Sequence, residues 1–167
     1  DDGKTLAFVV NEAGAEKLHV FQFPSMKEIA VKGKIPMGTL GGLSFHSNNR
    51  DLAFSLNSAQ TSMDAYSVDV KTGDLTRWTE RETGGLDATA FSKPEPIMWK
   101  SFDGKEIYGF LYRPPARFSG PRPVIVNIHG GPESQFQPVF LGRNNYLLNE
   151  LGVAIIFPNV RGSAGFG

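Results

Sequence analysis

A run of apolar residues that ends in two glycines is the part of this sequence best suited to chemistry. Residues 123–128 read Pro-Val-Ile-Val-Asn-Ile, and residues 129–132 read His-Gly-Gly-Pro. The β-branched run predicts a strand over 124–128 that is covered on both faces, as in a parallel sheet. The glycines let the backbone approach a ligand without a Cβ in the way. A main-chain N–H held in such a turn at the end of a sheet can stabilise an oxyanion.

A second glycine-rich segment follows the next apolar run, and residues 157–167 read Phe-Pro-Asn-Val-Arg-Gly-Ser-Ala-Gly-Phe-Gly. Ser163 in this segment and Ser134 near the first turn are the candidate nucleophiles. Neither lies in the Gly-x-Ser-x-Gly frame that presents a hydrolase nucleophile, since Gly162 directly precedes Ser163. The segment also fails the G-x-G-x-x-G spacing of a dinucleotide-binding loop. We therefore interpret it as a structural loop.

His129 and Arg161 are the side chains that could act beside these glycines. His129 could be a general base, but in a serine hydrolase of this chain order the base follows the nucleophile. We therefore interpret His129 as a residue that buttresses the turn by hydrogen bonding. Arg161 could bind a substrate carboxylate, but an arginine in a glycine-rich turn more often ties loops together through backbone carbonyls. With Gly162 it is predicted to form a structural loop.

Composition excludes several classes of function. The 167 residues include 17 Lys+Arg and 17 Asp+Glu, so charge gives no argument for binding nucleic acid or an anionic membrane. The absence of cysteine excludes disulfides, thiolate metal sites and a cysteine nucleophile within this stretch. No apolar run approaches the ~18 residues of a membrane span. The sequence does not decide between a cytoplasmic and a periplasmic compartment, and its carboxylates lack metal-ligand spacing.

The elements that would position the glycine turns follow from the apolar spacing. Residues 97–102 and 106–113 flank Asp103-Gly104, which is a two-residue hairpin signal. A helix is predicted over 139–151, with Gly152 as its C-terminal cap, and a second apolar strand over 153–157. Strand, helix and strand make a βαβ unit. The C-terminal half is therefore predicted to begin an α/β sheet with a hairpin at one edge.

Residues 1–80 predict short strands separated by polar turns. Leu-Ala-Phe occurs at 6–8 and again at 52–54, and each copy leads into a strand, a polar loop and another strand. The predicted loops are residues 11–16 and 57–63. The second unit is complete, with four strands predicted at 42–45, 51–56, 65–70 and 75–79. Four strands in ~40–50 residues are typical of a β-propeller blade, and a plain antiparallel meander is the alternative.

With these pieces in order, the chain resembles a serine peptidase of the prolyl oligopeptidase family, in its acylaminoacyl-peptidase-like branch. The resemblance rests on His-Gly-Gly-Pro at 129–132, Asn-Val-Arg-Gly-Ser-Ala-Gly-Phe-Gly at 159–167 and the hairpin at 101–114. It implies all-β propeller blades over 1–83, a linker over 84–96 and the N-terminal part of an α/β-hydrolase fold over 97–167. The sequence is then expected to be a fragment that stops before the nucleophile elbow.

The resemblance also implies a site. The family hydrolyses short peptides or acylated amino acids with a Ser-Asp-His triad, whose members would all lie beyond Gly167. This segment would supply the main-chain N–H of Gly131 as an oxyanion donor, in a turn supported by His129, Gly130 and Pro132. Cofactors and metals are not implied, and the partner is a peptide substrate rather than nucleic acid or membrane. Whether the parent enzyme forms a homo-oligomer stays open.

One departure from the family pattern narrows the expectation. The prolyl-oligopeptidase and dipeptidyl-peptidase branches carry a tyrosine where this chain has His129, and its hydroxyl is an oxyanion donor. His129 therefore favours an oxyanion hole made of backbone alone and argues against proline specificity and dipeptide release. Two alternatives remain, a non-catalytic propeller-hydrolase interaction protein and an esterase on the same scaffold.

Overall fold

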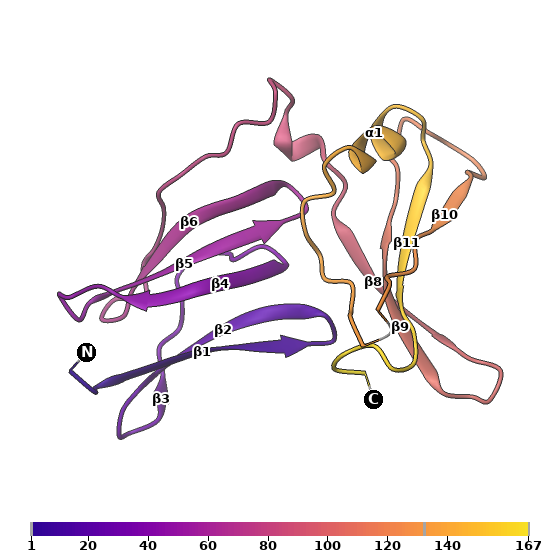
Figure 1. Cartoon of the computed structure of the whole chain (residues 1–167). Coiled ribbons are helices and arrows are strands. Elements are labelled where there is room, and N and C mark those ends of the chain that lie inside the picture. Colours follow the sequence, from indigo (N-terminus) through magenta and orange to yellow (C-terminus); the bar gives the residue numbers. More distant parts are fainter. Residues whose placement is uncertain (1, 132, 167) are drawn as a thin grey trace.

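The computed structural model describes residues 2–131 and 133–166, and within them eleven strands form three sheets (Figure 1). Pro132, which the sequence places in the glycine turn, lies outside the described residues, as do Asp1 and Gly167. The first two sheets come from the N-terminal half and the third from the C-terminal half. No helix in the described part of the chain has the length and apolar character needed to cross a membrane.

The first sheet is antiparallel and contains β1 (Thr5–Glu12), β2 (Ala15–Gln22) and β3 (Lys27–Glu28). The polar loop predicted over 11–16 is instead a two-residue turn. Ala13 and Gly14 both have positive φ, at 52° and 89°. Such turns join antiparallel strands tightly because their backbone twist matches that of the strands. The amide of Gly14 also donates to Asn11 Oδ1 at 2.9 Å.

The second sheet confirms the four-strand unit. It contains, in spatial as in chain order, β4 (Gly38–Phe45), β5 (Asp51–Ser58), β6 (Thr61–Asp69) and β7 (Leu75–Arg77). The predicted loop over 57–63 is again wrong, because β5 and β6 pair as far as Ser58 and Thr61 and leave only Ala59 and Gln60 between them. Ladder pairing therefore continues through residues whose polarity suggested a loop.

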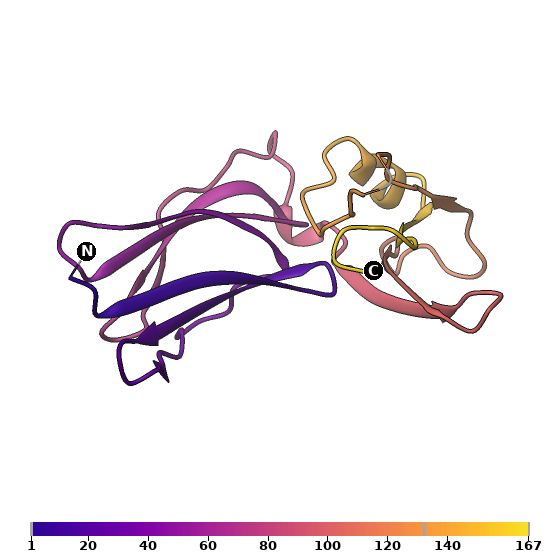
Figure 2. The same cartoon turned by 60° about the horizontal axis from the view of Figure 1, so that its bottom comes forward.

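The repeated Leu-Ala-Phe has the same orientation in both sheets. Leu52 and Phe54 of β5 are 0% and 3% exposed and belong to cores shared with the first sheet. Leu6 and Phe8 of β1 are 43% and 37% exposed, because it is Val9 that packs against the second sheet. Leu and Phe of the second copy thus face the first sheet, and those of the first copy face away from the second sheet. Successive sheets stacked in one sense, seen one above the other in Figure 2, form a propeller-like β domain.

The third sheet has the order β10-β11-β9-β8, with β8 (Pro94–Lys100), β9 (Glu106–Tyr112), β10 (Val124–Val126) and β11 (Ala154–Asn159). β10 and β11 are parallel, as predicted, and the other pairs are antiparallel. The β8–β9 hairpin is confirmed with a longer loop than predicted. Gly104 has φ of 82° and its amide donates to the Ser101 carbonyl at 3.0 Å.

The linker predicted over 84–96 contains the short 3₁₀ helix η1 (Ala88–Ala90) and ends earlier than predicted. β8 already pairs with β9 at Pro94, so Pro94 and Pro96 lie within a strand. β8 is an edge strand of its sheet. Proline is tolerated there because its nitrogen can face away from the ladder, where no N–H is needed.

The helix predicted over 139–151 is much shorter, and α1 spans Asn144–Asn149. Gly142 has φ of 53°, which no residue inside a right-handed helix can adopt. Ahead of it, the amide of Phe140 donates to Asn57 Oδ1 at 2.9 Å rather than to a helical carbonyl. Gly152 does end the segment as predicted, with φ of 64°, and the next amide, that of Val153, donates to the Leu147 carbonyl.

The third sheet and the propeller-like domain share a core. Ala59, at the β5–β6 turn, is 3% exposed and lies in one cluster with residues of the third sheet, of α1 and of the segment before α1, namely Phe110, Tyr112, Leu141, Leu148, Ile155 and Phe157. The β1–β2 turn docks beside it, where a Cβ added to Gly14 would lie 2.9 Å from the Phe110 ring. Gln137 Nε2 also donates to Glu16 Oε1 at 3.0 Å. The tips of both hairpins are therefore fastened to the third sheet.

The prediction that residues 124–128 form a strand covered on both faces is wrong for this chain. β10 is three residues long, and Val124, Ile125 and Val126 are 52%, 40% and 58% exposed. β10 is an edge strand with β11 as its neighbour on one side, and no described element covers its faces. The apolar run is thus present without the layers that such a run ordinarily packs against.

We expect the chain to self-associate through β10, because an exposed apolar edge strand is a template for pairing. Val126→Lys should shift the chain toward monomer, since a charge on an edge strand opposes edge-to-edge pairing. Sedimentation equilibrium measures the change. Met98→Lys is the matched control, on the exposed side of β8 at the other edge of the same sheet. An equal effect of both variants would contradict association through β10.

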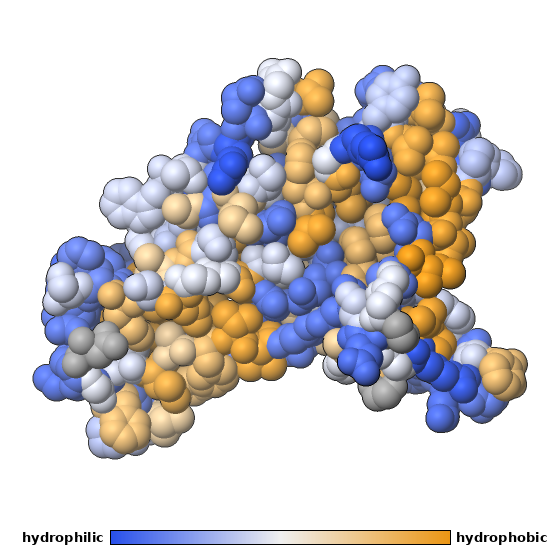
Figure 3. Space-filling model, in the orientation of Figure 1, coloured by the Kyte–Doolittle hydropathy of each residue, from blue (hydrophilic) through white to orange (hydrophobic). Residues whose placement is uncertain are grey.

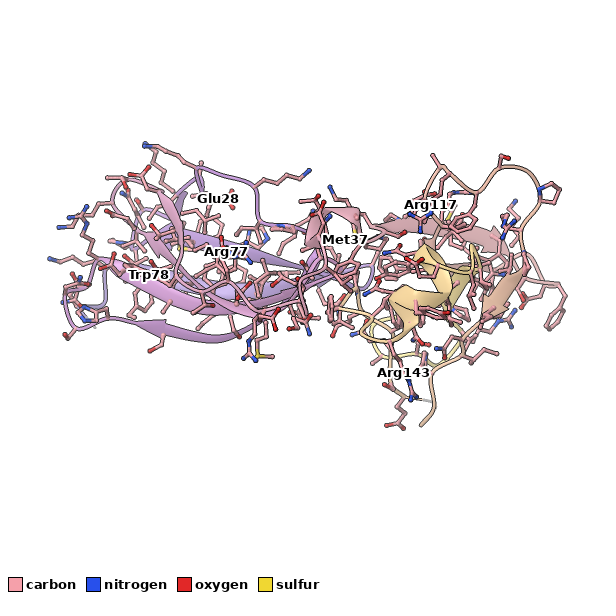
Figure 4. All side chains as sticks on the ribbon, turned by 90° about the horizontal axis from the view of Figure 1, so that it is seen from above. Glu28, Met37, Arg77, Trp78, Arg117 and Arg143 are labelled. Atoms are coloured by element: carbon pink, nitrogen blue, oxygen red, sulfur yellow. The ribbon has the colours of Figure 1, made fainter. Side chains whose placement is uncertain are left out.

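The second sheet contains a buried carboxylate hub. Asp64 of β6 is 0% exposed and accepts hydrogen bonds from the Thr61 hydroxyl, Arg77 Nη2 at 2.6 Å, the Thr79 hydroxyl at 2.9 Å and the Arg81 amide at 2.9 Å. Figure 4 shows Arg77 on β7 beside Trp78. Burial raises the pKa of Asp64, but the hydrogen bonds from Thr61, Arg77 and Thr79 outweigh it and hold that pKa below its ordinary value. The hub therefore ties the outer strand β7 to β6.

Asp64→Asn should lower the free energy of unfolding by about 1–3 kcal/mol, because it leaves buried donors without an acceptor of the same strength. Urea unfolding in the Val126→Lys background, followed by tryptophan fluorescence, measures this. Asp74→Asn is the control, with its side chain 62% exposed beside Lys32, and should change stability by at most about 0.5 kcal/mol.

The parent chain and Asp64→Asn also test how the free energy of unfolding depends on pH. A carboxyl whose pKa is lowered by folding stabilises the fold above its ordinary pKa, and that contribution is lost as the pH falls through the folded-state pKa. The stability difference between the parent chain and Asp64→Asn should therefore be largest near neutrality and shrink below about pH 4. A difference that grows as the pH falls would contradict the assignment.

Candidate functional site

The glycine turn lies at the carboxyl end of β10. Gly131 has φ of 61°, a left-handed conformation that is costly for residues with a Cβ. Its carbonyl accepts from the Ser134 amide at 2.8 Å, which closes the turn. A Cβ built on Gly130 or Gly131 would meet no described atom within 4 Å, so both main-chain sites face open space. The backbone conformation thus requires glycine at Gly131, and the space beside both glycines is free of described atoms.

His129 holds this turn to the second glycine-rich segment. Its Nε2 lies 2.8 Å from the hydroxyl oxygen of Ser163, and its Nδ1 lies 3.2 Å from the Gly130 carbonyl. A neutral ring that donates from Nδ1 to that carbonyl would accept from the Ser163 hydroxyl at Nε2. The geometry agrees with a buttressing role for His129. The sequence pattern presented its partner, Ser163, only as a candidate nucleophile.

Main-chain bonds reinforce the same junction. The Ala164 amide lies 3.1 Å from the Glu133 carbonyl and 3.0 Å from the Ser134 carbonyl. Gly162 and Gly165 have φ of 79° and 80°, so this loop also depends on left-handed glycines. The two glycine-rich segments are therefore neighbours, although a helix and a strand separate them in the sequence. Their parallel strands end at the same edge of the sheet.

Asn159 is a supporting residue that sequence reasoning missed. It is 1% exposed at the end of β11, where Oδ1 accepts from the Phe136 amide at 2.7 Å and Nδ2 donates to the Phe136 carbonyl at 3.1 Å. The side chain replaces a strand partner for the segment that leaves the turn. The available signal was a polar residue at the end of an apolar strand, which also fits an ordinary loop start.

Arg161 ties loops together, but by a different contact from the one predicted. Nη2 donates to Ser101 Oγ at 2.8 Å and to the Asp103 carboxylate, and the guanidinium lies over the Phe102 ring. These are side chains of the β8–β9 loop rather than backbone carbonyls. Burial raises the pKa of Asp103, but the hydrogen bond and charge of Arg161 together with main-chain hydrogen bonds outweigh it and keep that pKa below its ordinary value. Arg161 therefore anchors the second segment to the hairpin.

The described residues here do not form a catalytic Ser-His-acid arrangement. Ser163 is 2% exposed, and no hydrogen bond joins His129 to a carboxylate within residues 2–131 and 133–166. The pair therefore lacks both access and the third group that orients a catalytic histidine. The same residues contain no cluster of three or more His, Asp or Glu that could hold a metal ion. What remains is an open main-chain turn at the end of two parallel strands.

The fold defines a class of protein, in which a propeller-like β domain precedes a mixed sheet with a glycine turn. No family model matches the sequence. The chain is 37% identical over 78 residues to the "Uncharacterized peptidase YuxL" of Bacillus subtilis (strain 168), a match that covers 46% of this chain and 12% of that protein.

Solved structures match nearly the whole chain. A puromycin hydrolase is 25% identical with a TM-score of 0.81 over 98% of this chain and 25% of that one. A structure from a study of two prolyl endopeptidases is 18% identical with a TM-score of 0.79, covering 99% and 24%. Pyrococcus horikoshii acylaminoacyl peptidase is 22% identical with a TM-score of 0.72, covering 99% and 25%. The chain thus spans about a quarter of the length of these structures, and the predicted resemblance to prolyl oligopeptidase-family peptidases is confirmed.

We expect the 167-residue chain by itself not to react with a fluorophosphonate probe and not to hydrolyse peptides or esters above background. The reason is the burial of Ser163 and the missing carboxylate partner of His129. In-gel fluorescence after labelling measures reactivity. Ser134→Ala and Ser163→Ala are the matched variants. Labelling that survives the first and disappears in the second would revive Ser163 as a nucleophile.

Proposed function

We propose that this chain is part of a serine-type peptidase that hydrolyses short peptides or acylated amino acids by acyl transfer. Its contribution to catalysis is the main-chain N–H of Gly131, which donates to the developing oxyanion. The observation that carries the proposal is the open, left-handed Gly131 at the carboxyl end of β10. Ligands of open α/β sheets bind outside the carboxyl ends of the strands, which is where this turn lies.

The way the turn is held supports this role. An oxyanion donor is effective only if its position is fixed before the reaction, so that no reorganisation is needed when charge develops. His129, bound to Ser163, and the Ala164 amide fix the two sides of the turn. Arg161 fixes the neighbouring loop through Ser101. None of these contacts uses the Gly131 N–H itself as a donor, which leaves it available for substrate.

The division of the chain is part of the same proposal. Residues 1–83 are the last blades of a β-propeller, and residues 97–167 are the first part of an α/β-hydrolase domain. Residues 84–96 are the linker, although the pairing of β8 already begins at Pro94. The same-sense stacking of the first two sheets supports the first assignment. The parallel pair β10–β11 with α1 between its strands supports the second.

His129 supports the acylaminoacyl-peptidase-like branch, because it stands where the prolyl branches carry a tyrosine donor. Overall similarity does not separate the branches, since prolyl endopeptidases and an acylaminoacyl peptidase are both structural neighbours. Both ring nitrogens of His129 are engaged, Nε2 with Ser163 and Nδ1 with the Gly130 carbonyl, so the side chain offers no donor to the oxyanion. We therefore propose an oxyanion hole built from backbone N–H groups. The substrate is a peptide, and nucleic acid and membranes are not partners.

Gly131→Val keeps an N–H at this position, but a β-branched residue disfavours the left-handed φ of 61° and should turn that N–H away from the oxyanion. In the whole enzyme the variant should lower kcat by about 10²–10³, the usual effect of losing one oxyanion donor, with little change in KM. The reason is that this hydrogen bond strengthens in the transition state. Steady-state kinetics on a short peptide substrate measures the effect. Gly120→Val is the control, because Gly120 also has positive φ, at 74°, and open surroundings. Equal loss in both variants would indicate backbone strain instead of a lost donor.

The same experiment separates the alternatives. An esterase would show the Gly131-dependent turnover on an ester but not on the matched amide. A non-catalytic interaction protein would show no turnover of either substrate and no reaction with a fluorophosphonate. Near-normal kcat in a correctly folded Gly131→Val enzyme would remove Gly131 from the mechanism.

A further inference from the structure

A cavity lies between the linker and α1. Its volume is about 590 Å³, within the range of about 300–1,000 Å³ usual for small-ligand sites. One wall comes from the linker and η1, and the other from the segment that leads into α1. Its apolar lining includes Leu86, Phe91, Phe140 and Tyr146. Figure 3 shows the corresponding notch at the top of the molecule, with apolar residues along it.

The cavity and Gly131 lie at opposite ends of the strands of the third sheet. Asn149 and Glu150 at the end of α1 line it, and β11 begins shortly afterwards at Ala154. Pro115 lines it as well, just beyond the end of β9, which pairs at Tyr112 with the start of β11. Gly131 instead follows the end of β10, whose strand runs parallel to β11. The cavity is therefore separate from the oxyanion turn, and ligand binding in it is independent of the proposed function.

A buried amide side chain points to a ligand. Asn145 is 5% exposed and lines the cavity, yet neither its Nδ2 nor its Oδ1 has a hydrogen-bond partner among the described residues. Asn149, one turn further along α1, also lines the cavity and has a buried Oδ1 without a partner in the same part of the chain. Residues four apart share one helix face. Buried polar groups are nearly always paired in folded proteins, so this face calls for a polar partner.

The unpaired atoms define the chemistry of that partner. A carboxamide presents one acceptor and two donors, and a peptide group presents the complementary donor and acceptor. A carboxylate would leave Asn145 Oδ1 unpaired, and a cation would leave Nδ2 unpaired. The charged side chains of the lining also balance, with Arg117 and Arg143 against Asp87 and Glu150. In Figure 4 the two arginines lie on opposite sides of α1. The lining therefore favours an uncharged ligand.

We propose that this cavity binds the uncharged part of a short peptide separate from this chain, whose backbone amide group pairs with the side chain of Asn145 and whose apolar side chain packs against Phe91 and Phe140. These two rings meet edge to face, with centroids 5.5 Å apart, and give an apolar wall of fixed shape. The linker joins the propeller-like domain to the third sheet, so an occupied cavity bridges the two parts of the fold.

The test uses two small probes that differ in one group. Hydrocinnamamide carries an aromatic ring and one primary amide, and methyl hydrocinnamate replaces that amide by an ester without an N–H. Equilibrium dialysis of each probe against the unmodified chain gives the dissociation constants. We expect the amide to bind about tenfold or more tightly than the ester, because the ester leaves Asn145 Oδ1 unpaired. Equal affinities, or no binding of the amide at millimolar concentration, would overturn the proposal.

Variants locate the binding. Asn145→Leu keeps the size of the side chain and removes its polar atoms, and should abolish the preference for the amide. Asn144→Leu is the matched control, since Asn144 is the preceding residue of α1 and does not line the cavity. Ala90→Phe adds bulk from the opposite, exposed wall and should remove binding of both probes. A preference for the amide that persists in Asn145→Leu, or binding that persists in Ala90→Phe, would contradict the site.

Asn145→Leu also separates a ligand site from a structural role. If Asn145 serves a ligand, its removal should raise the melting temperature of the free chain, because an unpaired buried amide is replaced by an apolar group of similar volume. A lower melting temperature, with the amide preference unchanged, would mean that Asn145 supports the fold alone. If the variant does not fold, the amide-to-ester ratio on the unmodified chain and Ala90→Phe decide the question.

Discussion

The docking of two hairpin tips into the third sheet is the constraint on which the rest of the structure depends. Ala59 lies in the core made by Phe110, Leu148 and Phe157, although it belongs to the turn between β5 and β6. Gly14 packs directly on the Phe110 ring, where a larger residue would not fit. Cores of proteins are close-packed, so such contacts admit few alternatives. These two small residues, with the hydrogen bonds of Gln137 to Glu16 and of Phe140 to Asn57, position the propeller-like domain on the third sheet.

The geometry of the glycine turn depends on the same core. Asn159 completes β11 and binds the backbone of Phe136, whose ring stacks on Phe157 with centroids 3.8 Å apart. The segment between the turn and α1 is thereby attached to the same core that receives Ala59. His129 and Ser163 then close the turn from the other side. The turn is thus held on both sides by residues from other elements, through the side chains of Asn159 and Ser163 and the main chain of Ala164.

The two ends of the parallel strands β10 and β11 in the third sheet carry different kinds of site. At the carboxyl ends of β10 and β11, polar groups pair with one another and leave main-chain N–H groups open. Near the start of β11, the side chain of Asn145 is buried beside an apolar wall and has no hydrogen-bond partner among the described residues. The linker lies beside the start of β11, where it lines the cavity. Binding there would involve the junction between the two parts of the fold.

The amino-acid sequence by itself determined the features that depend on neighbours along the chain. The four-strand unit, the β8–β9 hairpin with Gly104 and the glycine turn after β10 all follow from strand patterns and turn residues. Tertiary structure decided the rest. It shortened the helix at Gly142, paired His129 with Ser163 and buried Ala59. It also left Asn145 without a partner in the part of the chain that the structure describes, while β10 stayed exposed despite its apolar run. The physical reason is that pairing, burial and hydrogen bonding between distant segments depend on where the whole chain places them, and no local pattern encodes that placement.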